Sequence, residues 1–179
     1  MNEKMMIKHK FRKNKPMKKI MLISIMAIAT IMVSCNHEPD FSPRIINYER
    51  DICAQCLMGI ADSLWGLQTI NTQEDVLWFD DIGCLVEYME TPNWKKYVNN
   101  QKVQYWVGNT KDGGWIDAQK AYYNYGKHTP MGYGYSAIPE SNDTTFTFNQ
   151  IVKRIEDGKT MREEFLQKYK MMGKSKMNH

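Results

Sequence analysis

The sequence VLWFDDIGCLVEYM, at residues 76–89, contains a strand-to-helix transition around which the rest of the fold can be predicted. Its first four residues are apolar and predict a short β-strand. Asp80 and Asp81 follow, where a carboxylate can accept hydrogen bonds from the free N–H groups of a helix start. Pro92 is expected to end this helix. Between Asp81 and Pro92, apolar side chains recur at helical spacing: Ile82, Leu85, Val86 and Met89.

The residues before this transition predict a second strand. Leu64–Ile70 alternates loosely between apolar and polar side chains, and residues 71–75 have the composition of a turn. A strand, a turn, a strand and a helix in this order form one small ββα-like unit.

The second half of the chain repeats this order of elements. Shorter elements are predicted from alternation and turn residues: strands at 103–107, 115–117 and 132–138, a turn at 109–114 and a short helix at 118–123. Asp143 or Thr144 is expected to cap a further helix, and a last helix is expected over 160–169 before a mobile tail from Met171. The predicted fold class is α+β, with two small strand–strand–helix (ββα-like) units and antiparallel sheets.

The N-terminus has the features of a secretory signal. Lys18 and Lys19 precede the 14 largely apolar residues Ile20–Val33, which are too few to span a bilayer comfortably, since that takes ~20. The run ends at Ser34-Cys35, and Val33-Ser34-Cys35 resembles the lipobox of bacterial lipoproteins. In that class the cysteine is acylated, for example with palmitate, and becomes the mature N-terminus.

This signal predicts where the protein acts. Residues 1–34 are expected to be a lipoprotein signal peptide, with translation beginning at Met1 or Met17. Residues 35–48 are expected to contain the lipidated Cys35 and a polar linker. The folded domain would then lie outside the cytoplasm in the cell envelope, in the periplasm, with its lipid in the outer or the inner membrane.

The distribution of charge argues against a nucleic-acid partner. The chain has 24 basic and 20 acidic side chains, but the first 34 residues contain eight of the basic and one of the acidic ones. The rest therefore has 16 basic and 19 acidic side chains, a formal charge of −3. A mildly acidic domain has no electrostatic footprint for nucleic acid.

A Cys-x-x-Cys-x-Met motif at Cys53–Met58 is the main candidate for chemistry. Its two thiols could form a redox disulfide, or supply half of a zinc site with Cys84 and His128. With the thioether of the final methionine they could instead bind Cu(I), a soft ion. A thioredoxin-type motif normally opens a helix, whereas a strand is predicted after this one. Lipidation of Cys35 leaves three cysteines, so one stays outside any intramolecular disulfide.

A second cluster follows at His128-Thr129-Pro130-Met131-Gly132-Tyr133-Gly134-Tyr135. Met131 stands between proline and glycine in a tight segment, so its thioether is a candidate soft ligand. A core position is the commoner use of methionine. His128 is a further candidate ligand, against the alternative of a structural or solvated histidine.

Four segments between Glu49 and Phe148 resemble those of NosL-type copper lipoproteins, in the same order and spacing. Leu57 departs from the family, which usually has glycine at this position. The four segments are Glu49-Arg50-Asp51-Ile52-Cys53-Ala54-Gln55-Cys56-Leu57-Met58, Phe79-Asp80-Asp81-Ile82-Gly83-Cys84-Leu85, Gly114-Trp115-Ile116-Asp117-Ala118 and Thr129-Pro130-Met131-Gly132-Tyr133-Gly134-Tyr135-Ser136-Ala137.

The resemblance implies a copper-binding domain over residues 49–158, followed by a C-terminal helix and tail over 159–179. It implies a Cu(I) metallochaperone and not an enzyme. Members of the family deliver copper during assembly of the copper–sulfur centre of nitrous oxide reductase, so that enzyme or its assembly factors would be the partner. Cys84 is expected to be a buried helix residue. The expected metal ligands are Cys56, Met58, Cys53, Met131 and His128.

The residues alone are also compatible with two other functions. One is a lipid-anchored thiol–disulfide protein that uses Cys53 and Cys56, and the other is a zinc-binding or structural lipoprotein. A hydrolase or nucleotide enzyme is not indicated, because no Ser/His/Asp set, carboxylate pair or phosphate loop stands out.

Overall fold

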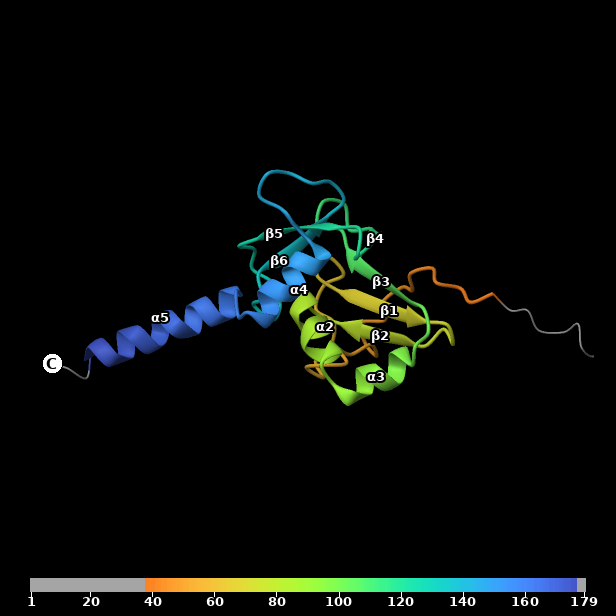
Figure 1. The fold of residues 1–179 in the computed structure, drawn as a ribbon, viewed down its shortest axis with the longest axis horizontal. Helices are drawn as coiled ribbons and strands as arrows, with labels where there is room; N and C mark the ends of the chain where they lie inside the picture. Colours follow the sequence, from red (N-terminus) through yellow and green to blue (C-terminus); the bar gives the residue numbers. More distant parts are fainter. Residues whose placement is uncertain (1–37, 177–179) are drawn as a thin grey trace, which may run out of the picture. The chain divides into compact units, whose positions relative to one another are not determined.

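A four-stranded antiparallel sheet forms around the predicted strand-to-helix transition (Figure 1). The computed structural model describes residues 38–176, and the strand order is β2–β1–β3–β4. The central strand β1 is buried along its whole length, which fixes its register against both neighbours. The strands are β1 (Leu67–Asn71), β2 (Val76–Phe79), β3 (Val103–Gly108) and β4 (Trp115–Asp117).

The predicted signal peptide (1–34) and the predicted lipidation site Cys35 lie outside the described residues. Within residues 38–176, no helix is long and apolar enough to cross a membrane. Part of the expected linker contacts the first sheet. The backbone N–H of Arg44 donates to Gln68 Oε1 at 2.7 Å, and Trp106 Nε1 donates to the carbonyl of Phe41 at 2.7 Å.

The helix after β2 forms as predicted. It is α2 (Ile82–Met89), and the Asp81 carboxylate accepts a hydrogen bond from the Gly83 N–H at its start. Pro92 does lie beyond the end of α2, but it also begins α3 (Pro92–Val98), which was not predicted. The fixed φ of proline suits the first turn of a helix, and Thr91 caps α3 by accepting from the Trp94 N–H.

A second antiparallel sheet has the order β6–β5–β7. The predicted helix at 118–123 is wrong, because residues 118–120 form a turn and a strand begins at Tyr122. Tyrosines favour strands, and the buried Tyr123 donates its hydroxyl to the carbonyl of Ala118 at 2.7 Å, holding the turn against the strand. The strands are β5 (Tyr122–Tyr125), β6 (Tyr135–Ile138) and β7 (Phe146–Thr147).

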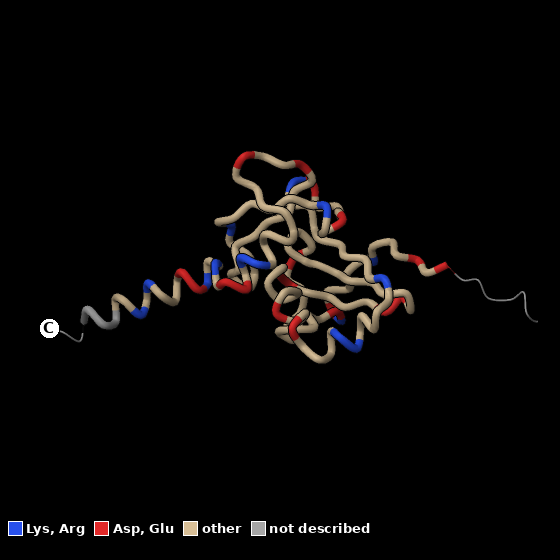
Figure 2. The backbone as a smooth tube through the Cα atoms, viewed as in Figure 1, with Lys and Arg blue, Asp and Glu red and all other residues tan. Residues whose placement is uncertain are grey.

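Two helices follow this sheet. The cap of α4 (Phe148–Glu156) is Thr147, which forms a capping box with Gln150. The predicted cap at Asp143 or Thr144 is therefore wrong, since both residues lie in a turn before β7. The last helix, α5 (Met161–Lys176), continues through the described part of the expected tail. Figure 2 shows acidic residues in its first turns and basic residues farther along.

Both sheets and the helices α2, α3 and α4 share one hydrophobic core. Helix α2 packs against β2, α3 and α4, which brings the start of α2 between the two halves of the chain. The predicted α+β class with antiparallel sheets is confirmed. The first unit is β1–β2–α2, strands β3 and β4 extend its sheet, and β5, β6, β7 and α4 form the second unit.

Candidate metal centre

The cysteine loop, residues 53–58, is held against the edge of the first sheet. Cys53 forms a parallel bridge with Trp78 in β2, and the Ala54 N–H donates to the Trp78 carbonyl at 2.8 Å. On the other side, Gln55 Nε2 donates to Glu87 Oε2 of α2 at 3.2 Å. The loop is therefore attached both to the strand before the transition and to the helix after it.

The loop is closed by its own backbone. The Cys53 N–H donates to the Met58 carbonyl at 2.8 Å, and the Leu57 N–H donates to the Cys53 carbonyl at 3.0 Å. This tight turn places Leu57 at a φ of 62°, in the left-handed region that favours glycine. The position at which this chain departs from the usual glycine is thus one where glycine would be unstrained.

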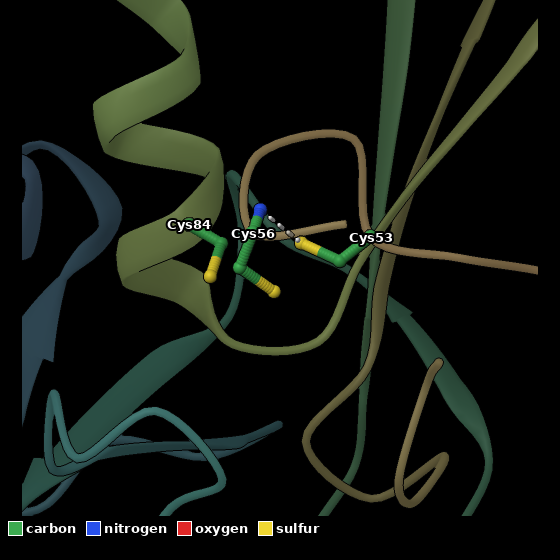
Figure 3. Close-up of side chains that lie close together, drawn as sticks. All are labelled: Cys53, Cys56 and Cys84. Atoms are coloured by element: carbon green, nitrogen blue, oxygen red, sulfur yellow. Dashed lines mark hydrogen bonds between the residues drawn. The ribbon is translucent and has the colours of Figure 1, made fainter. Parts of the chain in front are cut away.

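A third thiol reaches the loop from α2. The Sγ atoms of Cys53, Cys56 and Cys84 all lie within 4.8 Å of one another (Figure 3). Cys84 is a buried helix residue, as expected, and the structure adds that its sulfur belongs to this cluster. Cys53 is also buried, whereas Cys56 is partly exposed. Two of the three thiols are therefore shielded from solvent by the protein, and solvent can reach the cluster at Cys56.

The three thiols shift one another's pKa. A hydrogen bond from Cys84 is the main cause that lowers the pKa of Cys53 well below its usual range. The same contact raises the pKa of Cys84, and burial raises the pKa of Cys56. One sulfur of the cluster is thus readily ionised while the other two hold their protons, which a soft metal ion can displace.

The remaining predicted ligands lie at different places. Met58 ends the cysteine loop and is 49 % exposed. Met131 is partly buried and packs against the core that includes Cys53 and Cys84. His128 is exposed and lines a groove with residues of α5, and it is not part of the thiol cluster.

The segment that contains Met131 is tied to the start of α2. Asp81 Oδ2 accepts hydrogen bonds from Thr129 Oγ1 at 2.5 Å and from the Met131 N–H at 3.2 Å. Burial raises the pKa of the Asp81 carboxyl to about 6, although these hydrogen bonds act in the opposite direction. Sequence reasoning assigned Asp81 only the role of a helix cap.

The donor set fits a soft ion with few ligands. Three thiols suit a soft ion such as Cu(I), while a structural zinc site needs four ligands. Among the described residues, no His, Asp, Glu or further Cys joins the three thiols as a fourth ligand. The zinc site that was to include His128 is therefore not assembled.

Comparisons with known proteins show to which family this chain belongs. No curated protein sequence matches it. Among solved structures, the crystal structure of the copper chaperone NosL from Shewanella denitrificans is similar with 18 % sequence identity and a TM-score of 0.47. That match covers 65 % of this chain and 89 % of the other. The NosL family model matches residues 46–150, which include all four segments that carry the sequence resemblance. The chain belongs to the NosL family.

Proposed function

We propose that this protein is a membrane-anchored Cu(I) chaperone that acts outside the cytoplasm. The observation that carries the proposal is the cluster of three thiols within 4.8 Å in a member of the NosL family. Thiolates bind Cu(I) in preference to harder ions, and the cluster includes one thiol with a strongly lowered pKa. The expected lipid on Cys35 would hold the domain at a membrane surface.

The proposed ligand set adds one residue to the set expected from the sequence. Cys53, Cys56 and Cys84 supply thiolates, and Met58 and Met131 are the thioether ligands. The two protonated thiols lose their protons as copper binds, so uptake should release protons. His128 drops out of this set, because it lies apart from the three thiols.

The exposure of the cluster suits a carrier. Cys53 and Cys84 are shielded by the core, but Cys56 is partly exposed and Met58 is exposed. A ligand atom from a partner can therefore reach copper on this side before the first sulfur leaves. Anchoring restricts the search to the membrane surface and raises the effective concentration of an anchored partner.

The proposed client is an extracytoplasmic copper enzyme. Nitrous oxide reductase, or a factor that assembles it, is favoured by the family resemblance. In this scheme the chain transfers a metal ion and catalyses no reaction of its own.

A Cu(I) titration of the fully reduced protein against a chromogenic chelator tests the proposal. We expect about one copper per chain and a loss of affinity on Met58→Ala. Met171→Ala is the matched control, since Met171 is also an exposed methionine but lies on α5. A reduced protein that cannot compete for copper at all would contradict the proposal.

A thiol–disulfide function is the second candidate, because Cys53 combines the Cys-x-x-Cys spacing with a lowered pKa. The same variants separate the two functions. Met58→Ala should weaken copper binding but should scarcely change the rate of exchange with a small disulfide such as oxidised glutathione.

A further inference from the structure

The second half of the chain interlocks with the start of α2 at one buried carboxylate. The methionine loop, residues 128–134, contributes two donors to Asp81 Oδ2: the hydroxyl of Thr129 and the N–H of Met131. The other oxygen, Oδ1, accepts from the Gly83 N–H at 3.5 Å. Asp81 is only 1 % exposed, so these contacts replace water as its hydrogen-bond partners.

A close steric contact reinforces this junction. A Cβ added at Gly83 would lie 1.9–2.2 Å from ring atoms of Tyr133, so only glycine lets the ring pack here. The Tyr133 hydroxyl donates to Glu87 of the same helix and accepts from Arg162 at 2.9 Å. The methionine loop is therefore fixed along the first two turns of α2.

The junction connects two segments that carry candidate sulfur ligands. Asp81 precedes Cys84 by about one helical turn, and its carboxylate holds the backbone of Met131. A single side chain thus links the helix that bears a thiol to the loop that bears a thioether. Helix capping alone would use Oδ1 and would leave Oδ2 free for water.

We propose that Asp81 is a positioning residue of the copper site. It holds the methionine loop against α2 so that the Met131 thioether can join the sulfurs of Cys53, Cys56 and Cys84. The inference rests on the proposed Cu(I) function. Groups that orient metal ligands typically contribute 10–100-fold to metal affinity.

The test acts on the loop side of the junction and leaves the helix cap in place. Thr129→Val keeps the side-chain shape but removes the hydroxyl that donates to Asp81 and accepts from the Gly134 N–H. Cu(I) affinity is measured by chelator competition on the full reduced chain for Thr129→Val, Met131→Ala and the double variant. We expect each single change to lower affinity about tenfold, and the double change to lower it no further.

Two further variants separate positioning from general stability. Thr129→Ser retains a hydroxyl and should restore most of the affinity. Tyr97→Phe removes a hydroxyl that donates to the carbonyls of Thr69 and Asp75, away from the cluster, and should leave copper affinity unchanged even if the protein unfolds more easily.

The outcomes are distinguishable from those of the proposed function. If the unaltered protein binds no Cu(I), the chaperone proposal fails and this inference fails with it. If the unaltered protein binds Cu(I) but Met131→Ala has no effect, or if the effects of the two single changes multiply, the positioning role of Asp81 alone is overturned.

Discussion

The cysteine loop and the methionine loop meet the same helix but are built in opposite ways. The cysteine loop has an exposed tip, where Leu57 is 71 % exposed, and a strained backbone at that residue. The methionine loop is secured by the buried Asp81 and by Tyr133, which is 2 % exposed. Under the proposed function, the exposed side of the site suits copper exchange and the buried side supports the ligands.

The largest expected effect comes from the buried carboxylate. Burial raises the pKa of Asp81 from 3.8 to about 6, so between these values the folded protein retains a proton that the unfolded chain releases. Stability should therefore fall as pH rises from about 4 to 6, by ~3 kcal/mol at 1.36 kcal/mol per pKa unit.

Asp81→Asn should remove this fall, since asparagine does not titrate. The measurement is urea unfolding of the metal-free protein at pH 4 and pH 7, for both chains. Equal pH dependence in the two proteins would contradict the assignment of a raised pKa to Asp81.

The next effect concerns the two sides of the thiol cluster. Cys84→Ala and Cys56→Ser should each weaken Cu(I) binding about 100-fold, or ~2.8 kcal/mol, because each removes one thiolate. Val86→Ala is the control, because Val86 is a buried residue of the same helix outside the cluster. Copper affinity that survives the loss of Cys84 would limit the site to the cysteine loop.

Glycine substitutions compare the packing of the two loops. Gly83→Ala should destabilise the protein by roughly 1–3 kcal/mol, because the new methyl group would collide with the Tyr133 ring. Gly59→Ala, just after the cysteine loop, should cost far less, since nothing lies within 4 Å of the added atom. Urea unfolding measures both. Similar losses of stability at the two positions would contradict the difference in packing between the methionine loop and the cysteine loop.

The smallest effect is expected at Leu57. Leu57→Gly relieves the left-handed strain but increases the entropy of the unfolded chain, so the net gain should be about 0.5 kcal/mol. Leu57→Ala keeps the strain and should bring no gain. Thermal unfolding measures the stability of both variants. A Leu57→Gly variant that is less stable than the unaltered protein would contradict backbone strain at Leu57.

Local sequence patterns account for much of the fold and for most of the proposed ligands. The strand at 76–79 and helix α2 were predictable because their signals, a short apolar run and an aspartate cap, are local. The helix predicted at 118–123 failed because the burial of Tyr123 in a second sheet is a tertiary effect. Helix α3 was missed because Pro92 was taken only as a stop, although proline also begins helices.

In the site, too, local signals could be predicted and tertiary contacts could not. The Cys-x-x-Cys spacing revealed Cys53 and Cys56, but Cys84 joins them only because Cys53 pairs with Trp78, at the end of the strand that leads into α2. No spacing rule could supply that contact. The link between Asp81 and Met131 spans 50 residues and was likewise hidden, although each residue stood in a segment of the family resemblance.

X-ray absorption of the reduced, Cu(I)-loaded full chain tests the central claim most directly. If the three thiols hold copper, the spectrum should show a first shell of sulfur alone, and Cys84→Ala should lose one sulfur from it. A shell made mainly of nitrogen or oxygen, or one that is unchanged by Cys84→Ala, would contradict a copper site built on the three thiols.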